Sequence, residues 1–339
     1  MKRRFSQIIA LLLVLSIGLL AGCSTPAGNT GGGNDKGSAT SESSAASDYP
    51  KKDITLIVPF TAGGASDVQA RILEKYFKDE FGVGLIFQYK EGAGGEVGFT
   101  ALAQAKPDGY TIGTINMPHI VLQPLGRETE FDYKSFDYIG QVVDDPQILA
   151  VPADSDIKTM DQFIEKAKGQ KLTIGTVGTL TGNYMCALDF MDKAGVEMEI
   201  VPFDGSADQI VALQGKHVDC IMGNLNDLAR DPSQYTMLGI SSTERHDMVP
   251  DVPTFKEQNL DVESHITRLF AVPAGTDPAI LERLREGFEK ICTNENYLAD
   301  MKASGQPESF IGGEELTKVI EDQNDYYRDL LEKHDLLKK

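Results

Sequence analysis

The stretch ITLIVPFTAGGASD at residues 54–67 decides the fold, together with the related stretch LIFQYKEGAGGEVG at residues 85–98. In each, a short apolar run, at 54–58 and at 85–89, predicts a β-strand, and the glycine turn that follows leads into a pattern typical of a helix. Two such turns after neighbouring strands would bring free backbone N–H groups and two positive helix ends to one place. The sequence therefore predicts an anion site, for a carboxylate or a phosphate.

The rest of the chain alternates between strand and helix patterns. Ser66 followed by Gln69 predicts a capping box at the start of the first helix, which extends toward Phe81. Further helices are expected at 99–105, 160–168, up to 194, and at 208–214, and further strands at 110–115, 171–175, 198–201 and 218–222. This order predicts parallel βαβ units with their loops at the carboxyl ends of the strands, and two facing lobes that enclose one site.

The N-terminus has the pattern of a bacterial lipoprotein precursor. Three basic residues at positions 2–4 precede an apolar run at 8–20, which ends in Ala21-Gly22-Cys23 and predicts a signal peptide over residues 1–22. The residues before Cys23 resemble a lipobox, so Cys23 is expected to carry lipid and to hold the protein on the outer face of the cell membrane. An ordinary signal peptide with an incidental Cys23 is the alternative. Residues 24–48 lack Leu, Ile, Val, Phe and Tyr and are expected to form a flexible tether.

The charge of the chain argues against a nucleic-acid partner. The 339 residues carry a formal net charge of −19, and removal of residues 1–22, with three basic and no acidic residues, makes it −22. A chain this acidic repels nucleic acid and anionic membrane faces. An anionic ligand must therefore be attracted by local N–H groups and single cations. We expect a monomer that binds a small molecule.

Metal sites, cofactors and catalysis are not indicated. Cys186, Cys220 and Cys292 form no CxxC pair, and the five histidines have no metal-binding spacing, so the cysteines are interpreted as core residues. A hydrolase would need a GxSxG elbow, which the chain lacks. The turn at 92–97 has Val97 where a GxGxxG dinucleotide motif needs glycine. We therefore expect a binding protein without cofactor or metal, and not an enzyme.

Several short motifs, in order and at consistent spacing, resemble one protein family from position 49 nearly to the C-terminus. They are IVPF at 57–60 with GG at 63–64, GAGG at 92–95, AKPDGYT at 105–111, FDY at 131–133, VPF at 201–203 with GS at 205–206, PDVPT at 250–254 and PAGT at 273–276. In these motifs the chain is similar to the solute-binding components of tripartite tricarboxylate transporters, the Bug or TctC-like proteins.

This resemblance implies an α/β, two-lobed periplasmic-binding-protein fold of type II-like topology, each lobe a sheet flanked by helices. Lobe 1 would comprise residues 49–149 and 268–339, and lobe 2 residues 150–267. The implied function is capture of a small carboxylate, such as a tricarboxylate or dicarboxylate, for delivery to a permease with a large and a small membrane subunit. A carboxylate sensor that feeds a two-component signalling system is the alternative, because ligand capture would be the same in both.

The resemblance also assigns a ligand site. In the family, two loops grip a carboxylate through backbone N–H groups. On this chain they correspond to Phe60, Thr61, Ala62, Gly63 and Gly64, and to Gly92, Ala93, Gly94 and Gly95. Asp67 is interpreted mainly as an organiser of the first loop, with a ligand contact as the alternative. The same glycines would also suit tight turns and close helix packing.

Lobe 2 is expected to contribute Thr176, Gly178, Thr179, Thr181 and Asn183, with Phe203, Gly205 and Ser206. Their hydroxyl and amide groups are also suited to helix capping. Here the chain departs from the family, which usually has histidine in the first of these turns. Arg268 stands where the family has an aromatic residue. It is interpreted either as a cation for a second carboxylate or as a surface arginine paired with an acid.

Overall fold

The computed structural model describes residues 48–338, which belong to one compact unit. The predicted signal peptide, Cys23 and nearly all of the predicted tether lie outside the described residues. Within residues 48–338, no helix is both long and apolar enough to cross a membrane.

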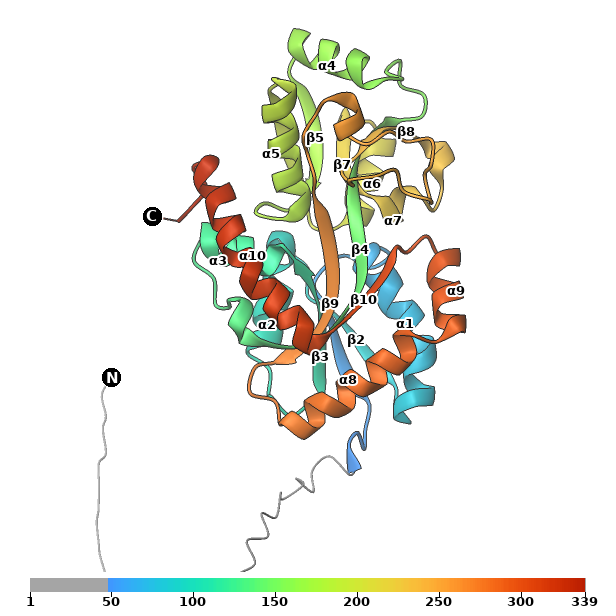
Figure 1. Cartoon of the computed structure of the whole chain (residues 1–339), viewed down its shortest axis with the longest axis vertical. Coiled ribbons are helices and arrows are strands. Elements are labelled where there is room, and N and C mark those ends of the chain that lie inside the picture. The colour runs from blue at the N-terminus through green and yellow to red at the C-terminus, as the bar shows by residue number, and fades with distance from the viewer. Residues whose placement is uncertain (1–47, 339) are drawn as a thin grey trace, which may run out of the picture. The chain divides into compact units, whose positions relative to one another are not determined.

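The described residues form ten strands and ten α-helices, which alternate from β1 to β8 (Figure 1). The strands are β1 (Ile54–Val58), β2 (Leu85–Tyr89), β3 (Thr111–Met117), β4 (Phe136–Pro152), β5 (Leu172–Val177), β6 (Met198–Phe203), β7 (Cys220–Asn224), β8 (Tyr235–Ile240), β9 (His265–Pro273) and β10 (Glu308–Gly312). The helices are α1 (Ala65–Phe81), α2 (Glu96–Ala103), α3 (His119–Gly126), α4 (Met160–Gly169), α5 (Gly182–Ala194), α6 (Ser206–Gln214), α7 (Leu225–Leu228), α8 (Pro278–Cys292), α9 (Glu295–Ala303) and α10 (Gly313–Lys333).

The long strand β4 connects two groups of strands. The strand order is β2-β1-β3-β9-β4-β7-β5-β6, and β8 and β10 also pair with β4. Up to Pro146, β4 pairs with β9 and β10, and from Gln147 onward it pairs with β7 and β8. We call β1, β2, β3, β9, β10 and β4 up to Pro146 the first half-sheet, and β5 to β8 with the rest of β4 the second half-sheet. The parallel pairs β1–β2, β1–β3, β5–β6 and β5–β7 confirm the predicted βαβ units.

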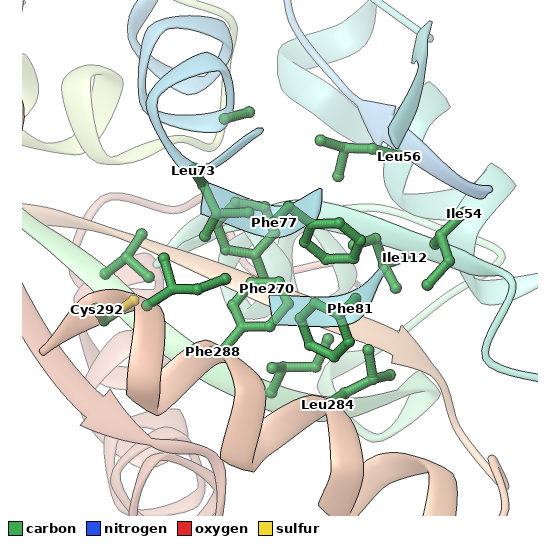
Figure 2. Packing of buried hydrophobic residues seen from close by; sticks show 14 of the residues in the cluster. Ile54, Leu56, Leu73, Phe77, Phe81, Ile112, Phe270, Leu284, Phe288 and Cys292 are labelled. Atoms are coloured by element: carbon green, nitrogen blue, oxygen red, sulfur yellow. The ribbon is translucent and has the colours of Figure 1, made fainter. Parts of the chain in front are cut away.

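Both faces of each half-sheet are covered by helices. On one face of the first half-sheet, α1 and α8 pack with β9 around the aromatic side chains of Phe77, Phe81, Phe270 and Phe288 (Figure 2). On the other face lie α2, α3 and α10, whose apolar residues form a second cluster. The second half-sheet lies between α4 and α5 on one face and α6 and α7 on the other. Cys186, Cys220 and Cys292 are buried and unpaired in these cores, as expected.

The predicted capping box is wrong. The N-cap of α1 is Gly64, which makes no side-chain capping bond, and Ser66 lies inside the first helical turn. The reason is a contact from the second half-sheet: the Ala65 N–H donates to the Ser206 Oγ at 3.1 Å. A hydroxyl distant in sequence therefore accepts the hydrogen bond that a local cap would otherwise accept.

Candidate functional site

A small cavity of about 20 Å³ lies between the two half-sheets. Its volume is close to the space that one water molecule occupies. The first half-sheet and its helices contribute Phe60, Ala65, Ser66, Asn116, His119, Ile266 and Arg268, and the second contributes Val177, Asn183, Ser206 and Asn224. Residues far apart in the sequence thus enclose one space, and most of its lining residues have polar side chains.

Four helices begin at this cavity. Ala65 and Ser66 are the first residues of α1, His119 is the first of α3, Asn183 the second of α5, and Ser206 the first of α6. Each helix N-terminus presents backbone N–H groups without intrahelical partners and about half a positive charge. The electrostatic field of these four ends favours a negative group in the cavity.

Arg268 is the one charged residue among those that line the cavity, and its side chain is 1% exposed. Its Nη1 lies 2.7 Å from the Oδ2 of Asp145, which is fully buried behind the cavity wall. Arg268 is therefore paired with an acid, as one of the two interpretations predicted. That interpretation placed the pair on the surface, which is wrong, because the pair is buried. Within the described residues, Nε and Nη1 have no hydrogen-bond acceptor of suitable geometry.

Asn116 and His119 place two further polar atoms beside Arg268. Asn116 on β3 pairs with Arg268 on β9, so both side chains lie on the same face of the sheet. The Asn116 Oδ1 and the His119 Nδ1 are buried and lack hydrogen-bond partners among the described residues. Burial, and secondarily the charge of Arg268, lower the pKa of His119 to about 3, so the imidazole is neutral at physiological pH.

Asp145 lies in a strongly desolvated position. Burial raises its pKa to about 6, although the charge of Arg268 opposes this shift. Its Oδ1 accepts a hydrogen bond from the Asn226 N–H at 3.1 Å. The carboxylate of Asp227, which forms an ion pair with Arg230, raises the pKa of Asp145 further. A buried carboxylate of this kind is easily protonated when another negative charge approaches.

The first glycine turn contacts α6. Gly64 comes so close to Ser206 that an added Cβ would lie 3.0 Å from the Ser206 Oγ, and one on Gly205 would lie 2.0 Å from the Thr61 Oγ1. Asp67 organises this turn, since its Oδ2 accepts a hydrogen bond from the Gly63 N–H at 2.7 Å. Of the residues predicted in this turn, Phe60 lines the cavity, while Ala62 and Gly63 are exposed to solvent.

The second glycine turn contacts the loop after β5. A Cβ added to Gly178 would lie 2.4 Å from the Gly94 Cα, so the two backbones touch. Arg127 bridges the two loops, donating to the Ala93 carbonyl at 2.8 Å and to the Thr179 Oγ1 at 3.2 Å. The predicted residues on these loops and at the end of β5 that lie outside the lining of the cavity are Gly92, Ala93, Gly94, Gly95, Thr176, Gly178, Thr179 and Thr181.

The structure thus brings four predicted residues to the cavity, namely Phe60, Asn183, Ser206 and Arg268. Phe203 is the last residue of β6 and Gly205 is the N-cap of α6, and neither lines the cavity. Sequence reasoning missed Ser66 as a lining residue, and also Asn116, His119 and Asn224. The signal for Asn116 and Asn224 was a polar residue at the carboxyl end of an apolar strand. Over residues 48–338, no group of three or more His, Cys, Asp or Glu could hold a metal ion.

The family model described as "Tripartite tricarboxylate transporter family receptor" matches residues 69–336. The chain belongs to this family. A similar protein from Cupriavidus necator, described as "UPF0065 protein in gbd 5'region", is 31% identical over 256 residues, which cover 74% of this chain and 77% of that one. The solved structure of the periplasmic binding protein BugD is 25% identical with a TM-score of 0.80, covering 86% of this chain and 100% of that one.

MatC from Rhodopseudomonas palustris, solved with bound malate, has a TM-score of 0.77 at 20% identity and covers 84% of this TctC family receptor and 100% of MatC. Together these matches confirm the predicted resemblance and the α/β periplasmic-binding-protein fold. The receptor is an extracytoplasmic solute-binding protein and not an enzyme.

Proposed function

We propose that this TctC family receptor captures a small organic carboxylate, such as a tricarboxylate, a dicarboxylate or a similar acid, between its half-sheets. The observation that carries the proposal is the convergence of the N-termini of α1, α3, α5 and α6 on one cavity beside Arg268. Aligned helix ends attract an anion locally, even though the chain as a whole carries a net charge of −19. The malate bound to MatC supports a carboxylate as the class of ligand.

Ligand capture would involve movement of two lobes, residues 49–149 with 268–339 and residues 150–267. In the structure the loops of the two half-sheets touch at Ser206 and at Gly178, and the cavity between them is about 20 Å³. An organic acid is larger than one water molecule, so the cleft must widen to admit it. Bending where β4 and β9 run between the lobes would open it, as in hinge-type binding proteins.

The proposed receptor is lipid-anchored through Cys23 and delivers its ligand to the large and small membrane subunits of a permease. The name of the matched family supports delivery to a permease, and the lipobox-like residues before Cys23 support the anchor. A receptor that reports the acid to a sensor kinase is the alternative. Uptake of labelled acid by cells with and without the receptor gene, compared with ligand-dependent gene induction, separates the two.

The proposal is tested by thermal unfolding of the protein with a panel of mono-, di- and tricarboxylates, with phosphate, NAD and ATP as controls. One or a few carboxylates should raise the melting temperature, and stabilisation should grow with the logarithm of ligand concentration, as when only the folded state binds. The same acids should reduce the radius of gyration in small-angle scattering if the cleft closes around them. Stabilisation by NAD or ATP, with no response to any carboxylate, would overturn the proposal.

A further inference from the structure

We propose that Asp145 determines the charge of the ligand group that contacts Arg268, which we call the inner end of the ligand. Asp145 has this effect because it already neutralises Arg268 from behind the cavity wall. The inner end is bound without net charge. It is either an uncharged amide or hydroxyl, or a carboxylate that enters together with one proton. This inference rests on the proposed carboxylate function and deepens it, since it makes Asp145 a residue that determines specificity.

The geometry of the pair carries the proposal. Arg268 lines the cavity, while Asp145 is fully buried outside the lining, with its Oδ2 2.7 Å from the Arg268 Nη1. The Asn226 N–H at 3.1 Å holds the carboxylate of Asp145 in place. A ligand carboxylate at Arg268 would therefore share one guanidinium with a second, fixed carboxylate. Two like charges so close in a desolvated site cannot both stay ionised without a large penalty.

The unpartnered polar atoms show what an uncharged inner end would contact. The Arg268 Nε is an unpaired donor, and the Asn116 Oδ1 on the neighbouring strand is an unpaired acceptor. A primary amide or a hydroxyl group can accept from the first and donate to the second. An ionised carboxylate can only accept, so it would leave the Asn116 Oδ1 without a donor in the amide orientation of the structure. The hydrogen-bonding pattern and the charge balance thus favour the same kind of group.

Binding of a carboxylate together with one proton, the second of the two possibilities, depends on pH. In the protein without ligand, burial raises the pKa of Asp145 to about 6. The charged groups that face it are Arg268 and His265 on β9 and Asp227 on α7, the last paired with Arg230. A ligand carboxylate at Arg268 raises the pKa of Asp145 further. Above pH 6 a dicarboxylate must therefore bring a proton, and its affinity should fall by about tenfold per pH unit.

The test uses succinate and adipate with their monoamides, pairs that match in size and differ in the charge of one end. For the wild type we expect the monoamide of each pair to bind more tightly at pH 7.5, with an affinity that does not change between pH 6.5 and 8. The dicarboxylates should weaken over this range. Calorimetry in two buffers of different ionisation enthalpy should show uptake of about one proton with the dicarboxylate and none with the monoamide.

The variant Asp145→Asn should unmask Arg268, raise the dicarboxylate-to-monoamide affinity ratio by about tenfold or more, and abolish proton uptake. The double variant Asp145→Asn with Arg268→Gln removes both charges and should again prefer the monoamide. The matched control is Asp144→Asn, on the neighbouring residue, whose carboxylate pairs with the part-buried His265 at 2.9 Å. It should leave the ratio and the proton uptake within about twofold of wild type, which excludes His265 as their source.

The outcomes separate this inference from the proposed function. If wild type binds both members of a pair equally well at every pH, without proton uptake, the role of Asp145 is disproved while carboxylate capture stands. The proton measurements on wild type decide this even if Asp145→Asn does not fold. If neither dicarboxylates nor monoamides bind, and no other carboxylate stabilises the protein, the proposed function fails and this inference fails with it.

Discussion

At the scale of single residues, the cavity combines side chains that would be unfavourable if any one stood alone. Arg268 is buried against Asp145, and Asn116 and His119 beside it have unpaired polar atoms. Unpaired buried polar atoms cost free energy, so their grouping in one place indicates a site shaped for a polar ligand. The pKa of His119, lowered by burial, keeps its imidazole neutral, so Arg268 remains the one cationic side chain in the lining.

The glycine turns make a sharp prediction at Gly94. Its φ is 70°, a left-handed conformation that costs other residues about 1–2 kcal/mol. An added Cβ would also lie 2.9 Å from the Thr181 Cγ2. Gly94→Val should therefore push the second glycine turn away from the loop after β5 and abolish ligand binding, measured by calorimetry, while circular dichroism shows a folded protein.

Gly195→Val is the matched control for Gly94→Val. Gly195 has a φ of 63° at the end of α5, and an added Cβ would meet nothing within 4 Å. This variant should carry the same backbone cost and still bind the ligand. A folded Gly94→Val protein with wild-type affinity would show that the second glycine turn takes no part in binding.

At the scale of elements, the site is built from helix N-termini, and α1 offers the clearest test. Ser66, in the first turn of this helix, lines the cavity. Ser66→Asp would place a tethered carboxylate where the helix dipole favours one, so the helix should tolerate it while the external anion is excluded. Calorimetry should show loss of ligand binding, whereas Ser66→Asn, of equal size but uncharged, should retain most of it. Equal binding by both variants would place the anion away from α1.

The elements also show what the sequence could predict. The bounds of β1 and β2 were predicted residue for residue, because alternating apolar runs bounded by glycine turns are strong local signals. The hydrogen bond from the Ala65 N–H to the Ser206 Oγ could not be predicted, because Ser206 lies 141 positions further along the chain. For the same reason the sequence showed Arg268 as a cation but did not reveal that Asp145 neutralises it.

At the scale of the whole molecule, the receptor is a folded unit preceded by a segment with its own predicted role. Cys23 lies outside the described residues, and its lipidation stays a prediction. Cys23→Ser should release the mature protein from the membrane into the soluble fraction, because the sequence indicates no second anchor between Cys23 and the folded unit. Cell fractionation with detection of the folded unit measures this. A Cys23→Ser protein that stays fully membrane-bound would contradict the lipoprotein assignment.

The shared strand β4 also limits how such a receptor can change its length. Side chains alternate between the two faces of a strand, so one inserted or deleted residue turns all that follow to the opposite face. The register of β4 against β9 already shifts between Tyr138 and Gly140 and between Gln141 and Val143, where a bulge accommodates an extra residue. A single insertion between Val143 and Asp145 would instead turn that carboxylate away from Arg268, and one directly after Pro146 would shift the second half-sheet against its helices. New segments can be accommodated in exposed turns, but the spacing along β4 is as restrictive as the identity of any residue in the cavity.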